Sequence, residues 1–303
     1  MAGLILNVPY GSPFVPKAIH KRLTLTEDEL RWENWHLTDP FLLDLVKKAA
    51  QPDIKPAPAS RDLVKPPPDN NFSSRLLVVS YPYSPLVADP LGLLALELGQ
   101  VKSPEPCILK RATQEKALPD WSPDERDFIF SRCVGPYIDE LVKSARDLLA
   151  TENLVILVNI RFFSHRPWLH QARPPLPTPQ ISLSLEESRT PKGLIHLLGH
   201  IFKTFGLWTE LDFPLAGTAV PQPLQALKRL KVLGLGLRRD LYLDEDKGAP
   251  KSSAESLSRV LKNVFGLLGQ ELDRVAQIRI RRAFPPKPPS SIIKAGKLPE
   301  TQS

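Results

Sequence analysis

The run Leu154–Ile160 constrains the fold of this chain more than any other segment. Its sequence, Leu-Val-Ile-Leu-Val-Asn-Ile, is apolar at both odd and even positions, so a strand here would bury both of its faces. Such strands are typical of parallel sheets that helices cover on both sides. Shorter apolar runs predict further strands at Leu4–Val8, Leu76–Ser80, Ile181–Leu185 and Val232–Leu237.

Helix start signals alternate with these runs. Thr26 and Ser122 each stand three residues before a glutamate, Glu29 and Glu125, which is the capping-box pattern. Apolar residues at helical spacing predict helices from Thr26 to about Trp35, after Asp39, over Phe128–Leu149, over Gly193–Phe205 and after Ser252. The alternation predicts an α/β fold: a single domain with a mixed, mostly parallel sheet covered by helices.

Proline is frequent in the connections. The chain has 33 prolines in 303 residues, and they concentrate in Gln51–Asn71, in Arg166–Pro179 and after Arg282. Proline cannot donate a backbone hydrogen bond, so the first two segments are expected to be surface loops. We expect one domain over residues 1–282 and a disordered Pro/Lys-rich tail over 283–303.

Charge and cysteine content exclude some classes of protein. The net charge is +7, and the excess of basic residues lies in the last quarter of the chain. Only two cysteines are present, which excludes a disulfide-rich scaffold. We find neither a secretory signal nor a run of ~18 apolar residues, so a cytoplasmic protein with no membrane span is expected.

Eight segments share their order and spacing with the motifs of a known family. They are Leu6–Ser12, Thr38-Asp39, Ser74–Val79 (with Ser60-Arg61 as a rival), Asp89–Gly92, Leu157–Phe162, Ile181–Pro191, Phe213–Gly217 and Leu235–Glu245. Together they resemble the N-formylglutamate amidohydrolase family over about residues 3 to 275. The resemblance implies a zinc-carboxypeptidase-like (phosphorylase/hydrolase-like) fold. It also implies hydrolysis of the formamide of N-formylglutamate by a zinc-bound water.

The sequence departs from this family where the metal and the base are expected. Histidines of the family pattern are replaced by Tyr10, Arg161 and Arg189, glutamates by Gly92 and Gly236, and an aspartate by Asn159. Tyrosine is a poor zinc ligand near neutral pH, glycine offers no donor, and arginine repels a cation. We therefore expect no metal and no catalytic residue.

A pocket that favours an anion is the remaining expectation at this site. Asp39 and Arg239 match the family pattern, and the resemblance implies that the arginine holds a substrate carboxylate. The candidate pocket residues are Tyr10, Asp39, Gly92, Asn159, Arg161, Arg189, Gly236 and Arg239. The resemblance predicts that the replaced positions 10, 92, 161, 189 and 236 converge in one cavity at the carboxyl edge of the sheet.

A metal site formed by other histidines is an alternative prediction. His196 and His200 stand four residues apart on a predicted helix, a spacing that zinc can use, although the Glu-x-x of a metalloprotease helix is missing between them. His165 follows the best strand and is a second possible ligand. The alternative to both interpretations is that these histidines are ordinary surface or core residues.

Three functions follow from these patterns. The leading hypothesis is a non-catalytic relative of the amidohydrolases that binds a carboxylate-bearing small molecule or a protein partner. The alternatives are an active metal-dependent amidohydrolase and a basic scaffold protein that acts through its tail. The tail has one aromatic residue, Phe284, and no recognised nucleic-acid module, so we do not expect nucleic acid as the partner.

Overall fold

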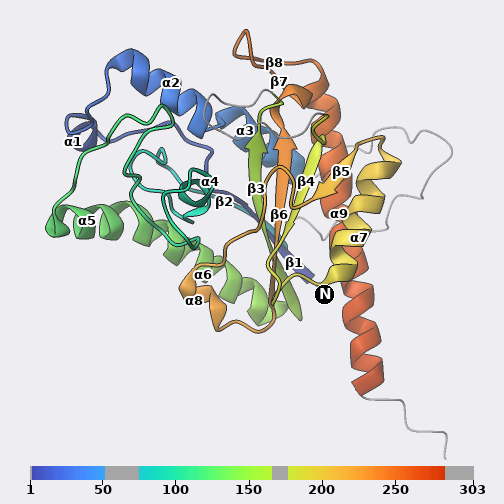
Figure 1. Cartoon of the computed structure of the whole chain (residues 1–303). Helices are drawn as coiled ribbons and strands as arrows, with labels where there is room; N and C mark the ends of the chain where they lie inside the picture. Colours follow the sequence, from blue (N-terminus) through green and yellow to red (C-terminus); the bar gives the residue numbers. More distant parts are fainter. Residues whose placement is uncertain (1, 52–74, 166–176, 284–303) are drawn as a thin grey trace, which may run out of the picture.

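A central sheet organises the molecule (Figure 1). The computed structural model describes residues 2–51, 75–165 and 177–283. The strands are β1 (Ala2–Val8), β2 (Leu76–Ser80), β3 (Leu154–Phe163), β4 (Ile181–Leu185), β5 (Thr209–Leu211) and β6 (Leu230–Arg238). They form a six-stranded sheet in the order β2-β1-β3-β6-β4-β5, and β7 (Leu243–Asp244) pairs separately with β8 (Ala249–Pro250).

The sheet is mixed, as the sequence predicts. Strands β2, β1, β3 and β6 are mutually parallel. Strand β4 runs antiparallel to β6, and β5 is parallel to β4. The carboxyl ends of β1, β3 and β6 therefore meet at one edge, and the chain enters β4 at that edge and leaves it at the other.

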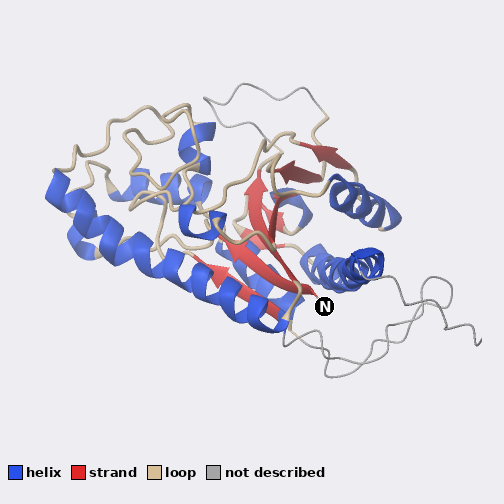
Figure 2. Cartoon of the chain, turned by 90° about the horizontal axis from the view of Figure 1, so that it is seen from below, coloured by secondary structure: helices blue, strands red, loops and turns tan. Residues whose placement is uncertain are grey.

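Helices cover both faces of the sheet (Figures 1 and 2). They are α1 (Lys17–His20), α2 (Glu27–Leu37), α3 (Pro40–Ala50), α4 (Leu93–Glu97), α5 (Pro123–Ile129), α6 (Gly135–Thr151), α7 (Lys192–Thr204), α8 (Gln222–Gln225) and α9 (Ser253–Ala283). Helices α3, α7 and α9 pack on one face, and α6 packs on β1, β2 and β3 from the other. This two-sided cover explains why every residue of β1 is buried.

Local signals place most helix ends as predicted. Thr26 and Ser122 form complete capping boxes with Glu29 and Glu125. Asp39 begins α3 by accepting the Leu42 amide hydrogen at 2.9 Å. These three caps satisfy amide groups that helix starts leave without a partner.

The predicted helix over Phe128–Leu149 contains one irregularity. A π-helical turn, Phe130–Val134, joins α5 to α6. Pro136 follows it and lacks the amide hydrogen that a regular α-helix needs, and its ring would contact the preceding turn. The wider turn accommodates the proline without ending the helix.

Some expectations fall partly or wholly outside the described residues. The predicted loops Gln51–Asn71 and Arg166–Pro179 and the predicted tail from residue 283 are among them. Within the three described ranges, no helix is both long enough and apolar enough to cross a membrane.

Candidate functional site

A small cavity lies at the carboxyl edge of the parallel strands. Its volume is about 20 Å³, close to the space of one water molecule. It is lined by Tyr10, which follows β1, by Arg161 and Phe162 of β3, by His36 and Leu37 of α2, and by Leu94 and Glu97 of α4. The structure thus brings together two of the replaced family positions, Tyr10 and Arg161.

Arg161 is the charged centre of this cavity. Its side chain is only 3 % exposed, and its Nη1 forms an ion pair with the Glu97 carboxylate. Its Nη2 donates to the backbone oxygen of Gly217 at 2.9 Å. Its Nε is buried and has no hydrogen-bond partner among the residues that the structure describes. The Nε–H group of this buried guanidinium is therefore without an acceptor in the part of the chain that the structure describes.

Glu97 approaches Arg161 from the surface. Glu97 is the last residue of α4, and its side chain is 25 % exposed. Burial raises the pKa of Glu97, and the Asp89 carboxylate also raises it, while the Arg161 charge acts in the opposite direction. The ion pair is thus the interaction that favours a charged Glu97.

Tyr10 is held by a buried carboxylate. Its hydroxyl donates to Asp89 Oδ1 at 2.9 Å and accepts from the Leu94 amide at 3.2 Å. Asp89 also accepts the amide hydrogens of Gly92 and Ala95 at 2.9 and 2.8 Å. Burial and the nearby Asp89 charge raise the pKa of Tyr10 well above its ordinary value, so the phenol keeps its proton.

Asp39 and Arg239 form a separate cluster behind Phe162. Arg239 Nε donates to Asp39 Oδ2 at 3.0 Å, and the Tyr242 hydroxyl donates to the same oxygen at 2.8 Å. The Arg239 guanidinium lies 4.9 Å from the Phe162 ring centroid and 4.4 Å from that of Trp35. Neither Asp39 nor Arg239 lines the cavity; both hold its wall in place.

Asn159 of β3 belongs to a separate network of buried amide groups. It accepts a hydrogen bond from Asn7 Nδ2 at 2.9 Å and donates to the Thr218 hydroxyl and the Ala219 carbonyl, both at 2.8 Å. Tyr137 in turn donates to Asn7 at 2.8 Å. The amide groups are engaged by protein, which favours a structural role for Asn159.

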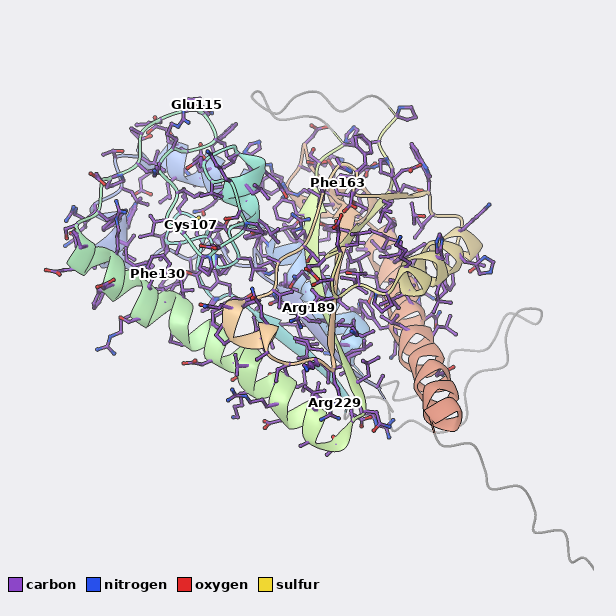
Figure 3. All side chains as sticks on the ribbon, turned by 60° about the horizontal axis from the view of Figure 1, so that its bottom comes forward. Cys107, Glu115, Phe130, Phe163, Arg189 and Arg229 are labelled. Carbon is purple, nitrogen blue, oxygen red and sulfur yellow. The ribbon has the colours of Figure 1, made fainter. Side chains whose placement is uncertain are left out.

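The expected convergence is wrong for Arg189. This residue donates to the backbone oxygens of Gln225 and Leu227, just before β6 begins (labelled in Figure 3). Because β4 runs antiparallel to β6, the chain that leaves Leu185 reaches the amino edge of the parallel strands. Arg189 therefore lies at the edge opposite the cavity.

Gly92 and Gly236 are close to the site but do not line it. Gly92 has φ +68° and begins α4, and a Cβ there would lie 2.0 Å from the Glu105 backbone oxygen. Gly236 is the register partner of Arg161, but a Cβ there would lie 2.8 Å from Leu215. The backbone leaves no space for a glutamate at Gly92, whereas at Gly236 the nearest atoms belong to the side chains of Leu215 and Ser182.

The three histidines that were alternative candidates for a metal site do not lie together. His196 and His200 lie on the exposed side of α7. His165 Nδ1 is 3.5 Å from a carboxylate oxygen of Glu245. Within the described part of the chain, no three His, Cys, Asp or Glu side chains are placed to hold a metal ion.

Sequence reasoning singled out only Tyr10 and Arg161 of the residues that line the cavity. Phe162 ends the segment Leu157–Phe162 but was not a candidate, and the other lining residues, His36, Leu37, Leu94 and Glu97, match no motif. One signal was available for Glu97, which is the only charged residue in the short helix Leu-Leu-Ala-Leu-Glu. An acid that ends an otherwise apolar helix needs either solvent or a buried cation.

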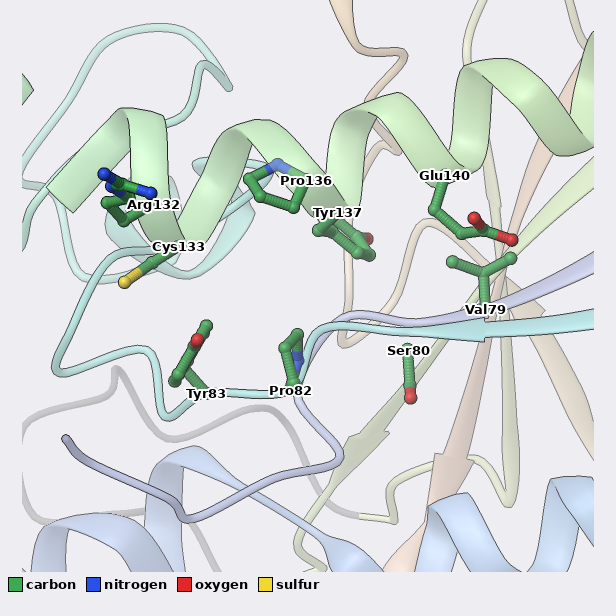
Figure 4. Close-up of a pocket in the computed structure, with 9 residues that line it drawn as sticks. All are labelled: Val79, Ser80, Pro82, Tyr83, Arg132, Cys133, Pro136, Tyr137 and Glu140. Atoms are coloured by element: carbon green, nitrogen blue, oxygen red, sulfur yellow. The ribbon is translucent and has the colours of Figure 1, made fainter. Parts of the chain in front are cut away.

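A second, larger hollow lies elsewhere (Figure 4). It measures about 210 Å³ and separates the end of β2 from the π-helical turn and the start of α6. Its lining includes Tyr83, Cys133 and Tyr137. Burial raises the pKa of the Cys133 thiol, which makes it a poor nucleophile.

Two solved structures share the fold of this chain. One is N-formylglutamate amidohydrolase from Ralstonia eutropha JMP134, with a TM-score of 0.63, 16% sequence identity, and coverage of 93% of this chain and 94% of that one. The other is gene product Atu2144 from Agrobacterium tumefaciens, with a TM-score of 0.62, 15% identity, and coverage of 89% and 92%. No family model and no curated protein matches the sequence. The α/β fold implied by the resemblance is confirmed.

Proposed function

We propose that this protein is a non-catalytic relative of the N-formylglutamate amidohydrolases, and that it binds a small carboxylate-bearing ligand at Arg161. The fold shared with the Ralstonia enzyme supports the relationship. The residues of the cavity support the loss of catalysis, and the buried guanidinium supports the choice of ligand. Each of these supports rests on a different observation.

The donors around the cavity do not fit a zinc ion. A catalytic zinc needs about three donors from histidine, cysteine or carboxylate side chains. Here Tyr10 keeps its proton because its pKa is raised, and Arg161 is a permanent cation whose charge faces the same cavity. A divalent ion at this position would be repelled by the guanidinium.

The observation that carries the ligand class is the unpartnered Nε of Arg161. A guanidinium presents five N–H groups in a planar fork that matches a carboxylate. Glu97 and the Gly217 carbonyl accept from the two terminal nitrogens, and the Nε hydrogen points to no acceptor among the described residues. An anionic oxygen placed there would satisfy a buried polar group that is costly to leave without a partner.

Two measurements on the purified, untreated protein test the loss of catalysis. Mass spectrometry of its metal content should find no stoichiometric divalent ion. Incubation with N-formylglutamate should release no formate above the rate of a heat-denatured sample. Stoichiometric zinc together with turnover would overturn the proposal.

Isothermal titration tests the ligand class. Acetate and formate should bind with measurable heat, and Arg161→Gln should abolish that heat. Inorganic phosphate tests whether any anion suffices. If neither carboxylate gives heat, or if Arg161→Gln binds as the unmodified protein does, the ligand assignment is wrong.

A further inference from the structure

Glu97 is the partner of Arg161 at the cavity. Its carboxylate is the acceptor for Arg161 Nη1, and Leu94 and Glu97 of the same short helix line the cavity. The side chain remains 25 % exposed, whereas that of Arg161 is 3 % exposed. The glutamate is therefore the part of this ion pair that solvent reaches more easily.

The free volume is too small for a carboxylate ligand beside Glu97. A cavity of about 20 Å³ has room for about one water. A second carboxylate would also lie near two acids, because Asp89 already raises the pKa of Glu97 by its charge. Both space and charge require Glu97 to move away before an anion reaches Nη1 of Arg161.

We propose that Glu97 occupies, as part of the same chain, the receptor that Arg161 offers to a ligand carboxylate, and that the ligand binds by displacing it. This inference rests on the proposed function. The incoming carboxylate would accept from Nη1 in place of Glu97, whereas the Nε hydrogen lies on the other edge of the guanidinium, which it shares with Nη2. The displaced Glu97 reaches water because part of its side chain is already exposed.

Acetate is the appropriate probe for this receptor. Replacing glutamate by alanine keeps Cβ and removes Cγ and the carboxyl group, which are the four heavy atoms of acetate. The Glu97→Ala variant therefore leaves a space of the shape of acetate in front of Arg161. Formate carries one carbon fewer and should fill this space less completely.

The experiment compares acetate binding by the full chain and by Glu97→Ala, using isothermal titration at constant ionic strength. We expect at least about tenfold tighter binding by the variant, because the unmodified chain carries a competing carboxylate at a local concentration of millimolar or more. Acetate should also raise the melting temperature of Glu97→Ala, whereas chloride at the same ionic strength should not.

Two control variants separate this effect from a general response to salt. Asp120→Ala removes the partner of Arg126 from an ion pair in which both side chains are well exposed, and it should bind no acetate at that site. Adding Arg161→Gln to Glu97→Ala should abolish the acetate effect. If Glu97→Ala does not fold, Glu97→Gln replaces it, since its neutral amide is a weaker acceptor for the guanidinium.

The outcomes are decisive for this inference and independent of catalysis. Equal acetate affinity in the two proteins, or persistence of the effect without Arg161, would overturn it. If metal and formate assays show no enzyme but Glu97→Ala gains no affinity, the displacement idea fails while the loss of catalysis stands. If the variant gains affinity but the protein contains zinc and turns over, the receptor stands and the loss of catalysis fails.

Discussion

Arg239 shows how this chain stabilises a buried charge. Its side chain is 1 % exposed and is among the largest fully buried groups. Its contacts are the Asp39 carboxylate, the Trp35 carbonyl at 2.9 Å and the faces of two aromatic rings. An ion with this many partners is costly to disturb, because removing one member leaves another charge buried and unpaired.

This arrangement predicts unequal effects for two substitutions. Arg239→Met should destabilise the fold by about 3–5 kcal/mol, because Asp39 would lose its cation. Tyr242→Phe should cost about 1–3 kcal/mol, because Asp39 would lose one hydrogen bond and keep the ion pair. Urea unfolding monitored by circular dichroism measures both. A larger loss for Tyr242→Phe than for Arg239→Met would contradict this view of the cluster.

Gly92 gives a second prediction at the scale of single residues. Gly92→Ala should destabilise strongly, since φ is positive and the added Cβ would overlap the Glu105 backbone. Gly266→Ala is the matched control, because a Cβ placed there in α9 meets no atom of the described residues within 4 Å, apart from its chain neighbours and the nearby backbone of its own helix. That change should stabilise by about 0.5–1 kcal/mol. Thermal unfolding of both variants checks the contrast, and similar effects would show that the turn at Gly92 tolerates side chains.

Helix starts were predictable because their cause is local. A capping box needs only two side chains three residues apart, so Thr26 and Ser122 reveal α2 and α5 without knowledge of the rest of the chain. The direction of β4 is different. Ile181–Leu185 has the same apolar composition whether it runs parallel or antiparallel, and its pairing with β6 is settled by the distant sheet. The misplacement of Arg189 follows from this non-local choice.

The cap of α2 predicts a pH dependence. A hydrogen bond from Lys116 and one from the Thr26 amide lower the pKa of Glu29 to about 2. A carboxyl whose pKa is lowered in the folded state stabilises above its unfolded pKa, near 4.5, and this stabilisation is lost as the pH falls toward 2. Glu29→Gln should therefore be less stable than the unmodified protein at pH 7, and the difference should shrink between about pH 5 and 2.

Thr26→Ala is the control for that measurement. It removes the hydroxyl that accepts the Glu29 amide hydrogen at 3.2 Å, and this hydroxyl does not titrate. Its cost of about 1 kcal/mol should persist at low pH. Urea unfolding at several pH values compares the two variants. A Glu29→Gln effect that stays constant down to pH 2.5 would show that the glutamate contributes no charge-dependent stability.

At the scale of the whole molecule, the sheet assembles the site from segments far apart in the sequence. Tyr10 and Arg161 meet because β1 and β3 are parallel neighbours, with Asn7 in register with Asn159. The family motifs predicted this meeting, since they follow the strands that form the sheet. They could not predict Glu97, because it belongs to none of these motifs and its ion pair with Arg161 joins segments far apart in the sequence.

The same assembly suggests that the fold does not depend on a metal. The hydrophobic core is continuous across the sheet and includes the buried residues of β1, β3 and β6. At the carboxyl edge, the Arg161–Glu97 pair supplies an internal cation and its counter-charge.

A bound ion at 100 times its Kd would stabilise the folded state by about 2.7 kcal/mol, which is a shift of several degrees in a protein of this size. We therefore expect treatment with a chelator, followed by dialysis, to leave the melting temperature unchanged within about 1 °C. Differential scanning calorimetry of treated and untreated protein makes the comparison. A drop of several degrees that added zinc reverses would mean that a metal stabilises this fold after all.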